Sequence, residues 1–222
     1  MTSTRADIAF LHTASVHVGT FNALAAELAP QLTLTHSVRE DLLSAAEKAG
    51  LVTPAIDLMT QEALLALAEN ARVVVCTCST LGASAEALDD ETSVPVLRID
   101  RAMADLAVKT GRRIGVAACA PTTVPNTQTL IRSSAARAKR EIAIRTFVFD
   151  DVWNLFREGR LTDYYEGIAT RLVDAARNVD VIVLAQASMA PAALMCGDLK
   201  IPVLSSPRIG FEAAVQALAV AE

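Results

Sequence analysis

Cys78 is the residue whose type and place in the sequence best suit chemistry. It follows the apolar run Val73–Val75 and precedes Ser79 and Thr80, where a helix is expected to begin. A thiol at the start of a helix lies near the positive end of the helix dipole, so we expect a lowered pKa and a larger thiolate fraction. Such a thiol suits a nucleophile or a proton-transfer base. The alternative is a small packed residue, as free cysteines often are.

Gln186 follows a second apolar run and occupies the place that Cys78 has in the first. An amide cannot act as an acid–base group at neutral pH, but it donates and accepts hydrogen bonds. Gln186 would therefore orient a substrate carboxylate or carbonyl, or else satisfy loop backbone. Small and hydroxyl-bearing residues line these loops and the other strand ends. The candidates for substrate binding are His12, Thr13, Ser79, Thr80, Thr122, Thr123, Ala187 and Ser188. The alternatives are helix capping for the threonines and a core histidine with satisfied hydrogen bonds for His12.

Other common site chemistries lack their signatures. No cluster of cysteine and histidine completes a metal site around Cys76 and Cys78, so we expect no metal. The glycine-rich loops that bind nucleotides are missing, so we expect no nucleotide cofactor. Trp153, Tyr164 and Tyr165 fall at helical spacing and are interpreted as packing residues.

The elements that position these residues alternate between short apolar runs and longer segments rich in Ala, Leu and Glu. Several runs are unbroken Val/Ile/Leu/Ala stretches, which indicates strands covered on both faces and hence mostly parallel sheets. The alternation predicts an α/β fold. The expected strands span residues 7–12, 32–36, 72–77, 94–99, 113–118, 141–148, 179–185 and 201–205.

The sequence repeats itself weakly at half its length. The runs that begin at Val73 and Val181 lie 108 residues apart, and Pro95 and Pro202, each within an apolar run, lie 107 apart. We therefore expect two similar Rossmann-like lobes related by a pseudo-two-fold axis. Ligands of open parallel sheets bind beyond the carboxyl ends of the strands. If the lobes face each other, Cys78 and Gln186 look across one cleft.

Composition narrows the class of protein. The chain has 222 residues, of which 52% are hydrophobic, with 20 basic and 25 acidic residues and a net charge of −5. The net negative charge argues against nucleic acid as a partner. The high hydrophobic content argues against a disordered chain. The sequence contains no membrane-spanning run and no secretion signal at the start, so we expect a cytoplasmic protein. A homodimer is expected only from base rates.

The chain resembles the aspartate/glutamate/hydantoin racemase superfamily. Cys78-Ser79-Thr80 looks like that family's Cys-Asn-Thr, and the loops at His12–Ala14 and Ala120–Thr123 fit it as well. The closest resemblance is to a branch that carries Cys-Thr-Cys-Ser-Thr and Ala-Gln-Ala-Ser-Met-Ala, here Cys76–Thr80 and Ala185–Ala190. The resemblance implies two lobes with a cleft and no cofactor. It also implies that the last helix returns to the first lobe, giving lobes of residues 1–100 plus 207–222 and 101–206.

One departure from the family bears on mechanism. Its racemases use two cysteines, one per lobe, whereas this chain has Gln186 at the second position, and Cys196 lies ten residues further on. We expect a cofactor-independent racemase or isomerase that acts on a small carboxylate or amino-acid-like substrate with Cys78 as its single thiol. Ser79, Thr80, Thr122, Thr123 and Ser188 would bind the carboxylate, and His12 is a candidate second ionisable group. The alternatives are a lyase that resembles arylmalonate decarboxylase and a small-carboxylate binding protein without catalysis.

Overall fold

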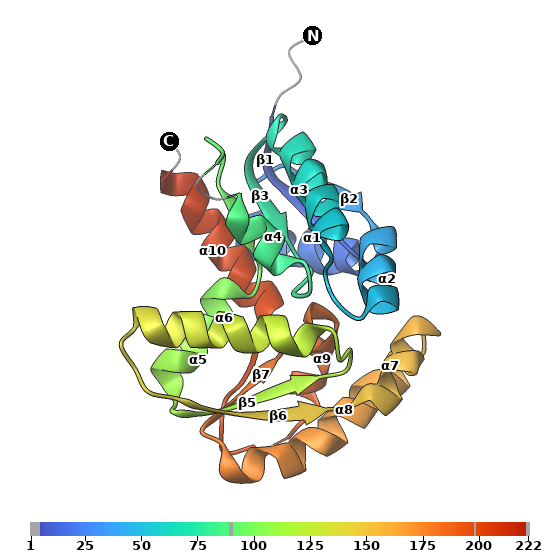
Figure 1. Ribbon diagram of the computed structural model, residues 1–222, viewed down its shortest axis with the longest axis vertical. Helices are drawn as coiled ribbons and strands as arrows, with labels where there is room; N and C mark the ends of the chain where they lie inside the picture. Colours follow the sequence, from blue (N-terminus) through green and yellow to red (C-terminus); the bar gives the residue numbers. More distant parts are fainter. Residues whose placement is uncertain (1–4, 89–90, 198, 221–222) are drawn as a thin grey trace. The chain divides into compact units, whose positions relative to one another are not determined.

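The computed structural model describes residues 5–88, 91–197 and 199–220. The chain forms two compact units (Figure 1). The first unit comprises the residues up to 100 together with those from 207 onwards, and the second comprises residues 101–206. Each unit is an α/β sandwich built around its own four-stranded sheet.

The sheet of the first unit is parallel and has the strand order β2-β1-β3-β4. Its strands are β1 (Ala6–His12), β2 (Leu34–Val38), β3 (Ala71–Cys76) and β4 (Val96–Arg98). Its helices are α1 (Val16–Leu28), α2 (Glu40–Ala49), α3 (Pro54–Ala68), α4 (Gly82–Ala87) and α10 (Ser206–Val220).

The sheet of the second unit is also parallel and has the order β6-β5-β7-β8. Its strands are β5 (Arg113–Ala118), β6 (Ala143–Val148), β7 (Val181–Leu184) and β8 (Val203–Ser205). Its α-helices are α5 (Arg101–Thr110), α6 (Thr123–Arg137), α7 (Asp150–Arg157), α8 (Leu161–Ala175) and α9 (Ala190–Leu194). Short 3₁₀ turns span Ala176–Asn178 and Ala187–Met189.

The two units therefore share one strand order: β1 corresponds to β5, and β3 corresponds to β7. The prediction of an α/β fold with mostly parallel sheets is confirmed. Helix α9 is short and ends at Leu194, and Asp198 lies outside the described residues.

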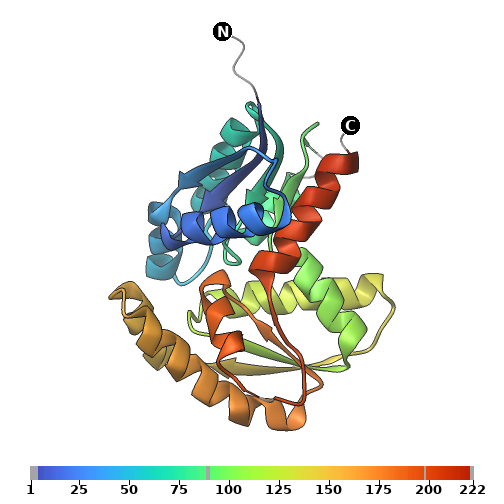
Figure 2. The same ribbon diagram turned by 180° about the vertical axis from the view of Figure 1, so that it is seen from behind.

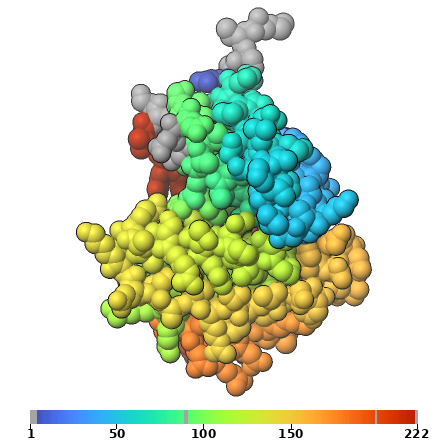
Figure 3. All heavy atoms as spheres, viewed as in Figure 1, coloured from blue at the N-terminus to red at the C-terminus, as the bar shows by residue number. Residues whose placement is uncertain are grey.

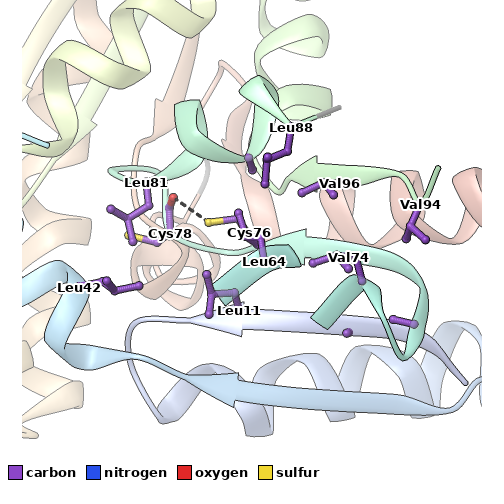
Figure 4. Packing of buried hydrophobic residues seen from close by; sticks show 14 of the residues in the cluster. Leu11, Leu42, Leu64, Val74, Cys76, Cys78, Leu81, Leu88, Val94 and Val96 are labelled. Atoms are coloured by element: carbon purple, nitrogen blue, oxygen red, sulfur yellow. Dashed lines mark hydrogen bonds between the residues drawn. The ribbon is translucent and has the colours of Figure 1, made fainter. Parts of the chain in front are cut away.

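Both faces of the first sheet are buried, which explains the unbroken apolar runs. Helices α1 and α10 cover one face (Figure 2). There Phe21 of α1 and Phe211 of α10 pack with Phe10, Val73 and Val75. A second cluster covers the other face with helices α2, α3 and α4; its strand residues include Leu11, Val74 and Cys76 (Figure 4). A Cβ at Gly210 would collide with the backbone oxygen of Ile99, so glycine lets α10 approach this sheet closely.

The second sheet is covered in the same way. Helices α7, α8 and α9 contribute to one apolar cluster with β5 and β7, in which Tyr164 is fully buried. Helix α6 contacts β5, and α5 contacts β7 and β8.

Not every helix is polar on its outer side. Helix α3 lies at the surface (cyan in Figure 3) and exposes Leu58, Met59 and Leu65. Within the described residues, no helix combines the length and the apolar character that crossing a membrane requires.

Candidate active site

Cys78 lies two residues beyond the end of β3 and continues its alternation. Side chains two apart in a strand point to the same face, and Val74, Cys76 and Cys78 all belong to the apolar cluster under α2, α3 and α4 (Figure 4). The Cys76 thiol donates a weak hydrogen bond to the Cys78 carbonyl over 3.7 Å. Only 8% of Cys78 is exposed. The Cys78 side chain is therefore almost completely shielded from solvent.

Burial raises the pKa of Cys78 above the ordinary thiol value. Four donors oppose this effect: the hydroxyls of Thr13 and Thr80 and the backbone N–H groups of Thr80 and Leu81. The expectation of a lowered pKa was therefore wrong in sign. Helix α4 begins only at Gly82 and has six residues, so the cost of removing the thiolate from water exceeds what the nearby N–H groups return. Cys78 rests as a thiol surrounded by donors that stabilise its anion.

Ser79, the residue that follows Cys78, carries a further hydrogen-bond donor. Its hydroxyl is buried and has no hydrogen-bond partner among the described residues, and only 4% of the residue is exposed. A buried hydroxyl without a partner costs free energy, on the order of 1–3 kcal/mol. A ligand oxygen bonded to Ser79 would remove that cost.

His12 is the last residue of β1 and is completely buried. Its Nδ1 lies 2.9 Å from Thr77 Oγ1, and its Nε2 lies 2.9 Å from His36 Nδ1. Burial, followed by repulsion from His17 and His36, lowers the pKa of His12 to about 3. The ring is thus neutral at pH 7 with both nitrogens occupied. This geometry favours the interpretation of His12 as a core histidine over that of an acid–base group.

The buried histidines predict loss of stability in weak acid. Burial also lowers the pKa of His17 to about 4. Below pH 6.5 the unfolded chain binds protons at these rings while the folded chain does not, so stability falls as pH falls. We expect the free energy of unfolding to drop by about 1.4 kcal/mol per pH unit for each histidine. Urea unfolding at pH 7 and pH 5 measures the drop.

A double variant, His12→Asn with His17→Asn, separates this effect from carboxylate titration. Lowered carboxyl pKa values, such as that of Asp7, act below pH 4 because their ordinary value is 3.8. The variant should therefore lose less stability between pH 7 and pH 5 than the parent. Equal losses in the two proteins would contradict the assignment.

Gln186 follows β7 in the second unit, at the place that corresponds to Cys78 after β3. Its Oε1 accepts hydrogen bonds from the backbone N–H groups of Cys119 (2.6 Å) and Ala120 (2.9 Å). Two N–H donors require an acceptor, which fixes the orientation of the amide. The side-chain NH2 group is consequently directed away from this pair. Gln186 therefore clamps the loop after β5 and retains two N–H donors.

Ser188 and Thr122 accompany Gln186 in the loops of the second unit. The Ser188 hydroxyl lies 3.1 Å from the hydroxyl of Tyr164. Thr122 occupies the N-cap position of α6 without a capping hydrogen bond from its side chain, and its buried hydroxyl has no partner within the described chain. Capping therefore does not account for this hydroxyl. Ala187 is buried beside them, and Thr123, in the first turn of α6, is buried and has a partner.

No pattern in the sequence indicates which groups the Tyr164 hydroxyl contacts. Tyr164 was interpreted as packing, and its ring does contact Trp153, Phe156 and Tyr165. Its hydroxyl additionally reaches Ser188 and the Cys119 thiol, whose pKa burial raises to about 12. The helical spacing predicts on which face of the helix the aromatic ring lies, but it does not predict which groups the hydroxyl contacts.

Two further residues carry no prediction from the sequence: Arg98, the last residue of β4, and Asp100, two residues further on. They form a buried pair with two hydrogen bonds, 2.7 and 3.1 Å long, and a third joins Arg98 to Glu86 of α4 over 3.0 Å. The guanidinium lies so close to Gly82 that a Cβ there would come within 2.7 Å of it. The pair thus fixes the start of α4, next to the Cys78 loop. The sequence signal that could have identified this pair is the presence of two opposite charges, Arg98 and Asp100, next to an apolar run.

Two further observations bear on ligands. A groove of about 280 Å³ lies at the C-terminal ends of α5 and α6, lined by Asp105, Lys109, Ser134, Arg137 and Ala138. It contains none of the candidate residues, and two of its charged residues, Arg137 and Asp105, form an ion pair with each other. Across residues 5–88, 91–197 and 199–220, no three His, Cys, Asp or Glu side chains are grouped as metal ligands would be.

Comparison with known proteins places this geometry in context. The family model described as Asp/Glu/Hydantoin racemase matches residues 13–214. No curated protein matches the sequence.

Three solved structures illustrate the likeness. Glutamate racemase isoform RacE1 from Bacillus anthracis is 14% identical with a TM-score of 0.71, covering 97% of this chain and 82% of its own. An aspartate racemase homologue from Pyrococcus horikoshii OT3 is 14% identical with a TM-score of 0.70, covering 96% and 99%. A Gly74Cys mutant of arylmalonate decarboxylase is 19% identical with a TM-score of 0.54, covering 96% and 93%. At these identities the likeness shows the fold.

Proposed function

Because this chain belongs to the Asp/Glu/hydantoin racemase family, we propose that it transfers a proton at a carbon next to a carboxylate or carbonyl group, with Cys78 as its single thiol and without a cofactor. The observation that carries the proposal is the arrangement around Cys78. A nearly buried sulfur is surrounded by two hydroxyls and two N–H groups that stabilise its anion.

The proposed substrate is a small carboxylate or carbonyl compound. The loops of the two units supply uncharged donors: the free hydroxyls of Ser79 and Thr122 and the NH2 group of Gln186. We propose that the Ser79 hydroxyl, next to Cys78 in the sequence, binds an oxygen atom of the substrate. Donors of this kind stabilise the negative charge that develops on oxygen when a neighbouring carbon loses its proton.

The proposed reaction has one proton carrier. The Cys78 thiolate removes the proton from the α-carbon, so the C–H bond breaks, an S–H bond forms and the electron pair moves onto the carboxylate or carbonyl oxygen. The reverse step returns a hydrogen from sulfur to carbon. Gln186, which stands in the sequence where the family's second cysteine would be, has no proton-accepting group. The hydrogen therefore returns to the face from which it was removed.

This mechanism predicts exchange of the α-hydrogen without inversion. In D2O, we expect the enzyme to replace the α-proton of a substrate by deuterium while its optical purity is preserved. A panel of enantiopure aspartate, glutamate and hydantoins, followed by proton NMR and chiral chromatography, measures both rates. The Gln186→Cys variant should add inversion, because it supplies a second thiol. Inversion as fast as exchange in the parent protein would contradict single-thiol chemistry.

Decarboxylation is a second candidate that the same observation favours. A substituted malonate loses CO2 to give an enediolate, which needs only one protonation, and the Cys78 thiol would supply it before solvent returns the proton to sulfur. The likeness to arylmalonate decarboxylase at a TM-score of 0.54 concerns the fold. Release of CO2 from phenylmalonate without α-exchange in phenylacetate distinguishes this reaction. Binding of small carboxylates with neither exchange nor CO2 release would identify a binding protein.

A further inference from the structure

The strand pairing of the first unit extends beyond the strands to the sulfur. Strands β1 and β3 are paired in register as far as Leu11 and Cys76. The next residues continue this order, because the Thr77 N–H donates to the Leu11 carbonyl over 3.0 Å. His12 then stands opposite Thr77, and Thr13 stands opposite Cys78. Both of these pairs interact through their side chains: His12 with Thr77 by a 2.9 Å hydrogen bond, and Thr13 with the Cys78 thiolate.

The two pairs lie on opposite faces of the sheet. His12 stacks against Phe10 and Phe21 on the face covered by α1 and α10, whereas Cys78 belongs to the cluster on the other face. His12 therefore lies on the other face of the sheet from the Cys78 sulfur. Any effect of His12 on that sulfur must be transmitted through the backbone of the residues that follow His12 and Thr77.

We propose that His12 is a positioning residue for Cys78. By holding Thr77 from behind the sheet, it keeps the two chain ends in register, so that the Thr13 hydroxyl stays aimed at the Cys78 sulfur. A donor must lie within a few tenths of an ångström of its place to stabilise an anion fully. Loss of the His12–Thr77 bond is therefore transmitted to the thiolate.

The rest of the hydrogen-bond chain keeps the His12 ring fixed. His36 Nδ1 bonds to His12 Nε2, and His36 Nε2 lies 3.1 Å from Oδ1 of Asn22 at the surface. Thr77 Oγ1 also lies 3.1 Å from the Leu11 carbonyl. Because the Thr77 hydroxyl donates to the Leu11 carbonyl, His12 Nδ1–H donates to Thr77 Oγ1 and His36 Nδ1–H donates to His12 Nε2. His36 Nε2 is then an acceptor that faces the Asn22 side-chain amide, so that amide would turn its NH2 group toward the ring. This arrangement gives His12 one orientation.

Two substitutions at His12 test the proposal. The side-chain amide of asparagine overlaps the position of Nδ1, whereas that of glutamine overlaps the position of Nε2. His12→Asn can therefore keep the bond to Thr77, while His12→Gln keeps only the bond to His36. The measurement is the rate at which iodoacetamide alkylates Cys78, followed by peptide mass spectrometry from pH 6 to pH 10. We expect the midpoint of the pH profile to rise by about one unit in His12→Gln, which is a roughly tenfold slower reaction below it, and to stay near the parent in His12→Asn.

Two controls distinguish positioning from a general loss of structure. His17→Asn alters a buried histidine whose ring lies next to that of His12, with ring centroids 6.1 Å apart, and it should leave the profile unchanged. Thr13→Val removes the donor itself, so it should raise the midpoint in the parent and have no further effect in His12→Gln. If His12→Gln does not fold, Thr77→Val breaks the same bond from the other side and should reproduce the shift.

The proposal deepens the proposed function, since it concerns the same thiol, but the labelling needs no substrate. A profile in His12→Gln or Thr77→Val that matches the parent, in folded protein, would overturn the positioning role while leaving the proposed reaction intact. Additive effects of Thr13→Val and His12→Gln would overturn it as well. Conversely, absence of exchange in D2O together with the expected labelling shifts would count against the reaction alone.

Discussion

Replacing Cys78 by alanine is expected to reduce turnover by about 10²- to 10⁴-fold, the contribution typical of a positioned acid–base group. The substitution removes one buried sulfur atom and leaves the hydroxyls of Thr13 and Thr80 in place, so the fold should persist. The measurement is the rate of α-deuterium exchange on the substrate that the D2O panel identifies, with circular dichroism to establish folding.

Cys196→Ala is the matched control for this variant. Its thiol is also buried but donates to the carbonyl of Ala192 within its own segment, 3.1 Å away. This variant should retain parental exchange. Exchange that survives in Cys78→Ala would remove Cys78 from the reaction and redirect attention to a binding function.

The pH dependence of the parent enzyme follows from the raised pKa of Cys78. The thiolate is the base, so the rate of proton removal should climb with pH through the neutral range and level off above the ordinary thiol value near 8.5. Decarboxylation would lack this rise, since its protonation step needs the thiol: the rate should stay level through the neutral range and fall only above the raised pKa of Cys78. The pH profile thus separates the two candidate reactions.

The fold could be predicted from the sequence because it depends on local patterns. Unbroken runs such as Val73–Val75 fit only strands covered on both faces, and the repeat near 108 residues predicts one plan used twice. The two sheets have equivalent strand orders for this reason. Family membership followed from the order of short loops rather than from any single motif.

The behaviour of the candidate site residues could be predicted less well, because it depends on partners distant in the sequence. Cys78 was expected to have a lowered pKa from its place before a helix, but burial outweighs so short a helix. The sequence leaves open whether Gln186 binds a substrate or satisfies loop backbone. In the structure its side-chain oxygen accepts hydrogen bonds from the loop after β5. His12 is neutral mainly because it is buried, and its ring nitrogens bond to His36 and Thr77, which lie 24 and 65 residues away.

Arg98→Met is expected to cause the largest loss of stability among these variants. The side chains of Arg98 and Asp100 are only 4% and 1% exposed. Removing the guanidinium leaves the Asp100 carboxylate buried without its partner, which typically costs about 3–5 kcal/mol. Glu86 loses less, because 36% of its side chain is exposed to water. Urea unfolding at pH 7 measures the change in the free energy of unfolding.

The double variant Arg98→Met with Asp100→Leu tests the physical cause. If the cost arises from an unpaired buried charge, removing the carboxylate as well should restore a large part of the stability. Arg137→Met is the exposed counterpart: its partner is Asp105, both side chains are more than one third exposed, and the change should stay within about 1 kcal/mol. A double variant no more stable than Arg98→Met would show instead that the guanidinium acts by packing against Gly82. In either case the loss should reach the Cys78 loop, because α4 begins at the residue that this guanidinium covers.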